Sequence, residues 1–284
     1  MRAAVLVPAP GFHESWDWAF DVEARALRQA GFDVEARPWN DVGDLSQFDL
    51  VTPLVAWGYH LDHPRWETLL DRLEKEAVPT LNPVGLLRWN SDKHYLSDLA
   101  DAGVATIPTM FVENLEEEVL AGARQSFGAE LVIKPLVSAS ADGTYRLGPG
   151  DPIPEDARTK MMMVQPFLAS IAEEGEYSIM MFGGEYSHAI VKRPKPGDFR
   201  VQPHLGGSEL ACAPPRGAVE LAQAALAAAP TEAIYARVDM VRDSGGQLVD
   251  IELELIEPAL WLQHSPDQGA NFGAAFRSAL ASRE

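Results

Sequence analysis

The chain of 284 residues contains one cysteine, Cys212. A single thiol excludes an intrachain disulfide and a cysteine-based zinc cluster, so the chemistry does not depend on sulfur and a reducing cytoplasm is expected. Basic residues are also scarce, because 23 Lys and Arg face 42 Asp and Glu, which gives a net charge of −19. This balance argues against a protein that coats nucleic acid or a membrane surface, and an anionic ligand would require a local cluster of cations.

Long apolar runs are absent as well. The first apolar run, residues 3–7, meets Pro8 too early for a signal-peptide core, so we expect no membrane segment. The loop after this run is Pro8-Ala9-Pro10-Gly11, and because no Gly-x-Gly-x-x-Gly follows, a Rossmann dehydrogenase is excluded. With 46% apolar and 23% charged residues, the chain instead has the composition of a folded protein with a large core.

The hydrophobic pattern predicts a small βαβαβ unit at the N-terminus. Apolar runs at 3–7, 34–37 and 48–55 are typical of strands, and 15–30 and 64–76 have the spacing of amphipathic helices. Loops at the carboxyl ends of such strands are where α/β sheets bind ligands, so 8–16 and 57–60 are candidate substrate loops. Their tryptophans and Tyr59 equally suit packing between domains.

The pattern changes after the break at Asn82-Pro83. We expect a helix capped by Asn90 or Ser91 and running to Ala102, with Lys93 in its first turn. From residue 131 onward, short strands separated by Gly, Pro and Ser indicate a mixed α+β layer, and 219–229 is predicted to be helical. The sequence therefore predicts α/β and α+β structure in three parts, residues 1–85, 86–175 and 176–284.

An acidic hairpin is predicted near the C-terminus, with strands 234–241 and 248–256 around Ser244-Gly245-Gly246. A two-residue turn would pair Asp239 with Glu252 and Arg237 with Glu254, and a three-residue turn would need a bulge to give the same pairs. Strand alternation places Asp250, Glu252 and Glu254 on one face. Opposed carboxylates repel by roughly 0.2–1 kcal/mol in a solvated sheet, so a Mg²⁺ site is predicted, with a solvated acidic face as the alternative.

Two basic elements interrupt the acidic chain. Lys192, Arg193, Lys195 and Arg200 fall within nine positions, which suits a clamp for a phosphoryl group or carboxylate, or a solvated loop. Lys134 ends an apolar strand and is followed by the small residues of 138–144, a composition that fits a flap over phosphates or an ordinary surface hairpin.

Four motifs in this order carry a resemblance to a known family. They are a hinge, Gln165-Pro166-Phe167-Leu168; a Gly-acid pair, Gly175-Glu176; a loop from Lys192 through Arg200 to Gly206-Gly207; and Glu252-Leu253-Glu254-Leu255-Ile256-Glu257-Pro258. The last follows an acid-x-Asn-x-x-x-Pro metal motif with Glu254 in place of Asn. From about Met1 to Leu260, the chain resembles the ATP-grasp carboxylate–amine ligases, of the bacterial glutathione-synthetase and D-cycloserine-synthetase types.

The resemblance implies an ATP-grasp fold preceded by an N-terminal βαβ domain, and it implies roles for single residues. Lys93 and Lys134 would hold the α- and β-phosphates of ATP under a flap that includes Ser138, Ser140 and Gly143. Gln165, Pro166, Phe167 and Leu168 would meet adenine, and Glu176 would accept the ribose hydroxyls, with Glu173 and Glu174 as alternatives. Asp239, Glu252 and Glu254 would carry two Mg²⁺ ions, or Mn²⁺. Arg200, Arg237 and Lys192 would be the catalytic cations.

The implied activity is an ADP-forming ligation that activates a carboxylate as an acylphosphate and joins it to an amine. Small amino-acid-derived substrates are expected, without nucleic acid or membrane partners, and a homodimer is left open. Two alternatives remain at this point: a kinase on the same fold, and a nucleotide-binding protein without turnover. Neither the carboxylate, the nucleophile, nor intramolecular as opposed to intermolecular coupling follows from the sequence.

Overall fold

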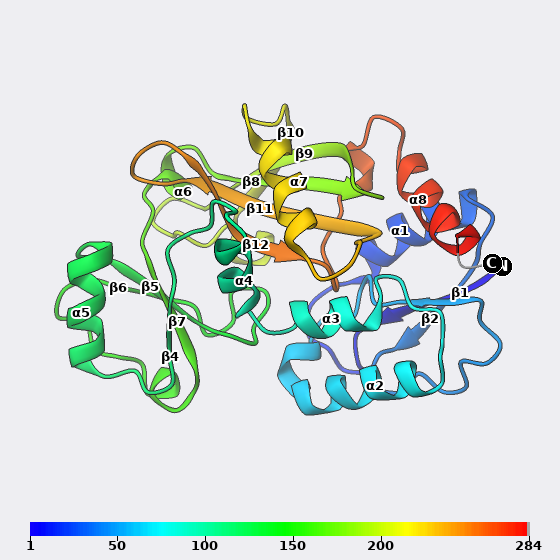
Figure 1. Ribbon diagram of the computed structural model, residues 1–284, viewed down its shortest axis with the longest axis horizontal. Helices are drawn as coiled ribbons and strands as arrows, with labels where there is room; N and C mark the ends of the chain where they lie inside the picture. The colour runs from blue at the N-terminus through cyan, green and yellow to red at the C-terminus, as the bar shows by residue number, and fades with distance from the viewer. Residues whose placement is uncertain (283–284) are drawn as a thin grey trace.

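Three β-sheets follow one another along the chain (Figure 1). This computed structural model describes residues 1–282, apart from the side chain of His204. In Figure 1 the N-terminal sheet lies on the right, the middle sheet on the left, and the C-terminal sheet between them. The mixed α/β and α+β class expected from the sequence is therefore confirmed.

The N-terminal sheet is the predicted βαβαβ unit. Its strands β1 (Arg2–Val7), β2 (Asp33–Pro38) and β3 (Leu50–Thr52) are parallel in the order β2-β1-β3, with helices α1 (Asp17–Gln29) and α2 (His63–Lys75). The third strand is shorter than predicted because Pro53 follows it directly and has no N–H to donate to a ladder.

The middle sheet is antiparallel, with the order β4-β7-β5-β6. It contains β4 (Met110–Val112), β5 (Leu131–Pro135), β6 (Tyr145–Leu147) and β7 (Met162–Pro166), and it is covered by α5 (Glu117–Phe127). Leu120 and Ala123 of α5 pack on Ile133 and Val164 of the sheet in a separate apolar core. The middle part of the chain therefore has its own core beside the larger ones.

The C-terminal sheet has the order β10-β9-β8-β11-β12, and all its pairs are antiparallel. Its strands are β8 (Glu176–Phe182), β9 (Glu185–Arg193), β10 (Ser208–Cys212), β11 (Tyr235–Arg242) and β12 (Leu248–Glu254). Helix α7 (Ala218–Ala228), at the predicted place, packs on one face through Ala222 and Ala225, and short α6 (Ser170–Glu173) precedes β8. The opposite face is left for the site described below.

The last helix, α8 (Ala270–Ala281), returns to the N-terminal part and packs against α1, as the red and blue helices of Figure 1 show. Gly273 permits this close approach, because a Cβ there would lie 2.6 Å from Cβ of Ala30. Phe272 and Phe276 of α8 share one core with Leu27 of α1 and Tyr235 of β11. The N- and C-terminal parts are thus joined by a common core, and the division at residues 85 and 175 stays a prediction.

The single helix predicted from Asn90 or Ser91 to Ala102 is wrong. The structure has two short helices, α3 (Val84–Asn90) and α4 (Tyr95–Asp101), joined by a turn that contains Lys93. Asn90 ends α3 instead of capping a helix, because its side chain bonds to the neighbouring sheet. Lys93 precedes α4, so it does not lie in the first turn of a helix as predicted.

The turn between α3 and α4 covers the free edge of β12. Asn90 donates to the carbonyl of Leu253 at 2.7 Å and accepts from the N–H of Leu255 at 2.8 Å. Tyr95 accepts from the N–H of Leu253 through its hydroxyl, and Asn82 donates to the carbonyl of Leu255. Residues 105–107 pair with the backbone of Asp250 earlier in this edge strand, and side chains satisfy the remaining part of the edge and fix its position.

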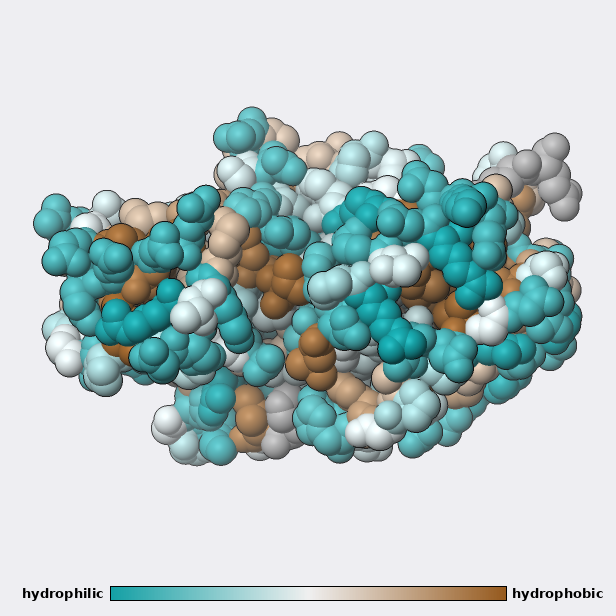
Figure 2. Space-filling model, turned by 90° about the horizontal axis from the view of Figure 1, so that it is seen from below, coloured by the Kyte–Doolittle hydropathy of each residue, from teal (hydrophilic) through white to brown (hydrophobic). Residues whose placement is uncertain are grey.

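The surface has no extended apolar region on the face in Figure 2, where hydrophilic residues predominate and the apolar areas are small and separated. Among the described residues, no helix has the length and hydropathy needed to cross a bilayer.

Replacing Asn90 by Ala should lower the free energy of unfolding by about 2–6 kcal/mol, because two buried backbone groups lose their partners at about 1–3 kcal/mol each. Urea unfolding at constant pH measures this change. Asn114→Ala, at an exposed position, is the matched control and should change stability by less than about 0.5 kcal/mol. Equal stability of the two variants would mean that the edge of β12 does not depend on Asn90.

Candidate active site

A cavity of about 760 Å³ is lined by residues from all three sheets. Fourteen of the sixteen predicted site residues line its wall: Lys93, Lys134, Ser138, Ser140, Gln165, Pro166, Leu168, Glu176, Lys192, Arg200, Arg237, Asp239, Glu252 and Glu254. Gly143 and Phe167 do not line it. The structure thus brings together side chains that are up to 161 positions apart, counted as 254 − 93.

The acidic hairpin has the register that the sequence predicts. Asp239 lies opposite Glu252 and Arg237 opposite Glu254. The turn, however, is not the two-residue turn. Arg242 pairs with Leu248 and Asp243 with the backbone of Gln247, which leaves residues 244–246 in the loop, and a register shift after Asp239 restores the predicted pairs. The three-residue turn with a bulge is therefore the correct alternative.

The prediction that Asp250 shares a face with Glu252 and Glu254 is wrong, because the bulge lies between them. Because one extra residue is inserted in β12, Asp250 pairs with Met240, whose side chain belongs to the core on the side of α7, and Ile251 lines the cavity instead. Asp250 is fully buried, and neither of its carboxylate oxygens has a hydrogen-bond partner among the described residues. Burial, with nearby Asp239, raises its pKa to about 8.

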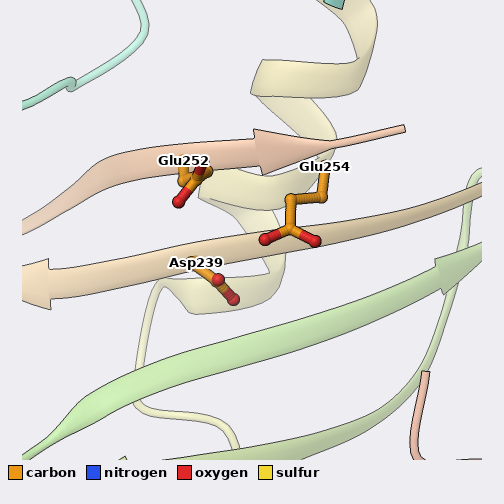
Figure 3. Close-up of side chains that lie close together, drawn as sticks. All are labelled: Asp239, Glu252 and Glu254. Carbon is orange, nitrogen blue, oxygen red and sulfur yellow. The ribbon is translucent and has the colours of Figure 1, made fainter. Parts of the chain in front are cut away.

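Three carboxylates do meet on the cavity face. One oxygen from each of Asp239, Glu252 and Glu254 lies within 4.8 Å of the others. Figure 3 shows Asp239 on β11 and the two glutamates on β12, with the carboxylate groups directed into the same space. This convergence follows from the register of the two strands, and it concentrates negative charge at one place in the cavity wall.

Cations from the α3–α4 turn and the middle sheet face Glu252. The ammonium of Lys93 lies 3.1 Å from Oε1 of Glu252 and donates to the carbonyl of Ser138. Burial opposes ionisation of Glu252, but Lys93 and Lys134 outweigh it and lower its pKa. Burial also lowers the pKa of Lys134, which within residues 1–282 forms no ion pair. Lys93 thus connects the acidic hairpin to the loop after β5.

Asp239 is the centre of the second group of charges. It is 1% exposed, and its carboxylate accepts from Arg237 at 2.9–3.1 Å, from Lys192 at 2.9 Å and from the hydroxyl of Ser178. Burial works against ionisation, yet Arg237 and Lys192 hold the pKa of Asp239 well below its usual range. Arg237 also contacts Glu254, and Lys192 contacts Glu176. Asp239 is therefore charged and paired in the cavity floor. Burial raises the pKa of Glu254 to about 8 and raises that of Glu176 above its usual value, although Arg237 and Lys192 act against it.

The loop after β5, predicted to be a flap, folds back on itself in tight turns. Ser140 and Ala141 have φ of 54° and 61°, and Gly143 has φ of 66°. The backbone N–H groups of Asp142 and Thr144 donate to the carbonyls of Ala139 and Ala141, so these two amides close the turns of the loop. Gly143 packs against Pro135, where a Cβ would come within 2.8 Å, so its role is to let the flap fold back on β5 rather than to line the cavity.

The hinge after β7 forms another part of the cavity wall. Gln165 donates to the hydroxyl of Thr109 at 2.9 Å, and Pro166 and Leu168 line the cavity. The ring of Phe167 lies under the guanidinium of Arg146, 3.6 Å from the ring centroid, so this side chain is outside the cavity. Of the three candidate ribose acids, only Glu176 is among the lining residues, while Glu174 pairs with Arg242.

Arg200 lies on the long loop between β9 and β10. Its guanidinium donates to Asp198 at 3.0 and 3.1 Å, and the same carboxylate accepts from the backbone N–H groups of Phe199 and Arg200. The side chain of Arg200 is 35% exposed and lines the cavity, whereas the other two predicted catalytic cations are buried in the sheet. The loop thus presents one cation over the cavity from outside.

The end of the cavity near the N-terminal sheet is aromatic and acidic. Trp18, Trp57 and Tyr59 line it, together with Glu257, which follows β12. Trp57 donates from its indole N–H to the carbonyl of Glu257 at 3.1 Å. Both loops proposed as substrate loops therefore reach the cavity, while Trp16 packs in the core with Phe20.

Comparisons with known proteins agree with this arrangement. A family model described as the N-terminal domain of D-cycloserine synthetase DcsG matches residues 11–82. The cycloserine biosynthesis protein DcsG of Streptomyces lavendulae is 28% identical over 278 residues, which cover 90% of this chain and 91% of that protein. A glutathione synthetase of Prochlorococcus marinus (strain MIT 9313) is 30% identical over 203 residues, 66% of this chain and 63% of that protein.

The crystal structure of D-cycloserine synthetase DcsG superposes with a TM-score of 0.84 at 26% identity, over 99% of this chain and 100% of that one. The chain belongs to the ATP-grasp ligase superfamily. The resemblance inferred from the motifs is thereby confirmed, as is the ATP-grasp fold. The paired, converging charges described above line the cavity of a member of this superfamily.

Three residues of this ATP-grasp site were missed as site residues by the sequence reasoning. Ser178 supports Asp239, Asn90 fixes the strand that carries Glu252 and Glu254, and Glu257 lines the cavity. Ser178 has the same strand parity as Glu176, which was a usable signal. No sequence signal showed that Asn90 would bond to a strand more than 160 positions away.

Asp250→Asn should flatten the pH dependence of stability. The unfolded chain loses the Asp250 proton near its ordinary pKa, whereas the folded chain keeps it until about pH 8, so wild-type stability falls as pH rises between these values. Relative to Asp250→Asn, the loss should approach about 1.4 kcal/mol per pH unit. Urea unfolding from pH 5 to pH 8 measures it, and parallel curves for the two proteins would show that Asp250 is ionised in the fold.

Proposed function

We propose that this ATP-grasp ligase uses ATP and Mg²⁺ to activate the carboxylate of a small, amino-acid-derived substrate and joins it to an amine. The observation that carries the proposal is the meeting of Asp239, Glu252 and Glu254 with Lys93 and Lys134 in one cavity. The phosphates of a nucleotide are bound by a divalent ion and by lysines that either have no ion-pair partner or can exchange it for a phosphate.

The three carboxylates suit Mg²⁺. Oxygens bound to one Mg²⁺ at about 2.1 Å can be at most about 4.2 Å apart, and the three oxygens lie within 4.8 Å of one another, so small side-chain rotations suffice. Two ions would be shared among them. Glu254 stands where the family motif has Asn, and the added negative charge should tighten binding of the divalent ion, with Mn²⁺ as an alternative to Mg²⁺. Bound Mg²⁺ would neutralise charge on the phosphates and orient them.

The rest of the nucleotide is assigned along the cavity wall. Lys93 and Lys134 would hold the α- and β-phosphates under the flap of 138–144, and Glu176 would accept the ribose hydroxyls. Adenine would lie against Gln165, Pro166 and Leu168, where backbone groups and an apolar wall are available. Phe167 would support this hinge through its contact with Arg146 rather than touch the base.

The chemistry divides into two steps. A carboxylate oxygen of the substrate attacks the γ-phosphorus of ATP, the bond to the β,γ-bridging oxygen breaks, and an acylphosphate and ADP result. The amine nitrogen then attacks the acyl carbon, the C–O bond to phosphate breaks, and an amide and inorganic phosphate leave, the phosphate with the amine proton. Arg237 and Lys192 face the transferred phosphoryl group from the sheet, and Arg200 faces it and the tetrahedral oxyanion from the loop.

The test is whether turnover needs both reactants. ADP and phosphate release should require an acid and an amine together, and hydroxylamine in place of the amine should trap the acylphosphate as a hydroxamate. A kinase on this fold would release ADP with a hydroxyl compound and no amine, and a binding protein without turnover would release none. Amino acids and their hydroxylamine, urea and peptide derivatives, singly and in pairs, form the panel; release with one compound alone would indicate ring closure.

Mg²⁺ with ATP should raise the melting temperature by about 5 °C at a hundred times the dissociation constant, since binding adds about 2.7 kcal/mol. EDTA should remove most of this shift. Glu252→Gln should reduce it by more than half, and the exposed Glu185→Gln should leave it unchanged. A shift of equal size with and without metal would contradict the assignment of the three carboxylates.

Arg200→Ala should reduce kcat by about 100-fold or more while the dissociation constant of ATP changes less than about threefold. The reason is that Arg200 reaches the cavity from the loop and is not part of the paired sheet charges, so its contribution arises as charge develops in transfer. Steady-state kinetics and nucleotide titration measure the two constants. An equal loss in kcat and in ATP affinity would show that Arg200 contributes to binding of the nucleotide in the ground state.

A further inference from the structure

The charges of the cavity are distributed unevenly along it. Lys93 contacts the flap at Ser138 and is also the cation that acts most strongly on Glu257, which lies at the aromatic end of the cavity near the N-terminal sheet. Glu252, Glu254, Glu176 and Asp239 each have a cationic partner within 3.1 Å. Within residues 1–282 no ion pair includes Glu257, and the same holds for Glu209, which lies beyond Lys192 on β10.

Glu257 is placed between the acidic hairpin and the N-terminal sheet. Its charge acts on Tyr59 more strongly than any other charge does, and it also acts on Glu254. Its backbone carbonyl is held by the indole N–H of Trp57. The carboxylate therefore lies at the boundary where the metal-binding acids end and the aromatic wall begins.

The aromatic wall beside Glu257 has the composition of a cation site. The rings of Trp18 and Trp57 are 5.8 Å apart and tilted by 56°, and both line the cavity. Trp18 is 40% exposed, which is unusual for so large an apolar side chain, and its indole N–H donates to the carbonyl of Ser15. Indole faces attract a cation within about 6 Å, and most strongly when water is excluded.

We propose that Glu257, with the walls of Trp18 and Trp57, forms a subsite for the ammonium group of a substrate. The inference rests on the proposed function, because it assigns the opposite end of the cavity to the carboxylate that is phosphorylated. A substrate bound in this way carries its negative group toward Lys93 and the metal-binding acids and its positive group toward Glu257. It is therefore a zwitterion or is paired with a cationic amine.

An acid without a cationic partner in a buried site is costly to ionise. Burial raises the pKa of Glu257 to about 7, although Lys93 acts against it. A substrate ammonium would supply the missing partner, as Lys192 and Arg237 do for the neighbouring acids. An alcohol or a neutral amide in the same place would leave the carboxylate unpaired, which gives the subsite its selectivity.

The ammonium group belongs either to the acid that is activated or to the amine that attacks it. The first arm therefore compares L- and D-alanine with L- and D-lactate, and L- and D-serine with glycerate, as acids in the hydroxamate assay with ATP, Mg²⁺ and hydroxylamine. The second arm holds the acid constant and compares glycinamide, a cation, with hydroxylamine, which is neutral at pH 7.5. Binding of the same probes is followed by saturation-transfer NMR, which needs no turnover.

Glu257→Gln, a substitution of nearly equal shape, should raise the KM and the dissociation constant of ammonium-bearing probes by about 10- to 100-fold. The constants for lactate and glycerate should stay within about twofold. An effect confined to the first arm assigns the ammonium to the activated acid, and one confined to glycinamide assigns it to the nucleophile. Trp18→Ala should raise the dissociation constants of the same ammonium-bearing probes by about threefold, and Glu185→Gln should leave all of these constants unchanged.

Two results would overturn the subsite: wild-type protein that binds the ammonium probes no better than their hydroxy analogues, or a Glu257→Gln variant that loses both classes equally. A wild-type protein that forms neither hydroxamate nor ADP, but whose binding of alanine depends on Glu257, would refute the proposed ligation and leave the subsite standing. The melting temperature of each variant shows that the comparison is made on folded protein.

Discussion

The site depends on one constraint, the need to keep several buried carboxylates ionised in a small volume. Asp239 alone, at 1% exposed, would be neutral in such surroundings, but Arg237 and Lys192 contact it directly and make the charged form the stable one. Because each cation also contacts a second acid, Glu254 or Glu176, removing one cation would leave that acid without a cationic partner and Asp239 with a single one. The acids and cations of this network must therefore be present together, and they occur on strands of one rigid sheet.

This pairing also explains how the cavity can accept ligands that are themselves highly charged. In the proposed binding mode, a metal ion would take the place of Arg237 at Glu254, and ribose hydroxyls would donate hydrogen bonds to Glu176. Lys134 and Glu257, which lack ion-pair partners in the part of the chain that the structure describes, mark where a ligand adds new charge pairs.

The frame around these charges is equally specific. β12 is an edge strand. Its outer backbone groups are satisfied by residues 105–107 at Asp250 and by the side chains of Asn90, Tyr95 and Asn82 at Leu253 and Leu255. The turn that supplies Asn90 also carries Lys93, which bonds to the flap through Ser138. Movement of the flap is therefore linked, through a single short segment, to the strand with the metal-binding acids.

The sequence by itself determined much of this protein. Alternation and turn residues fixed the hairpin pairing of Asp239 with Glu252, and ordered motifs indicated the ATP-grasp fold, because these signals are local and their spacing survives in the chain. Only the tertiary structure decided three further points. A bulge turned Asp250 away from the cavity, α3 ended at Asn90 because its amide bonds to a distant strand, and Glu257 came to lie beside Trp18 and Trp57. Each of these depends on contacts between segments more than a hundred residues apart or on a one-residue insertion in a strand, and neither leaves a periodic signal in the sequence.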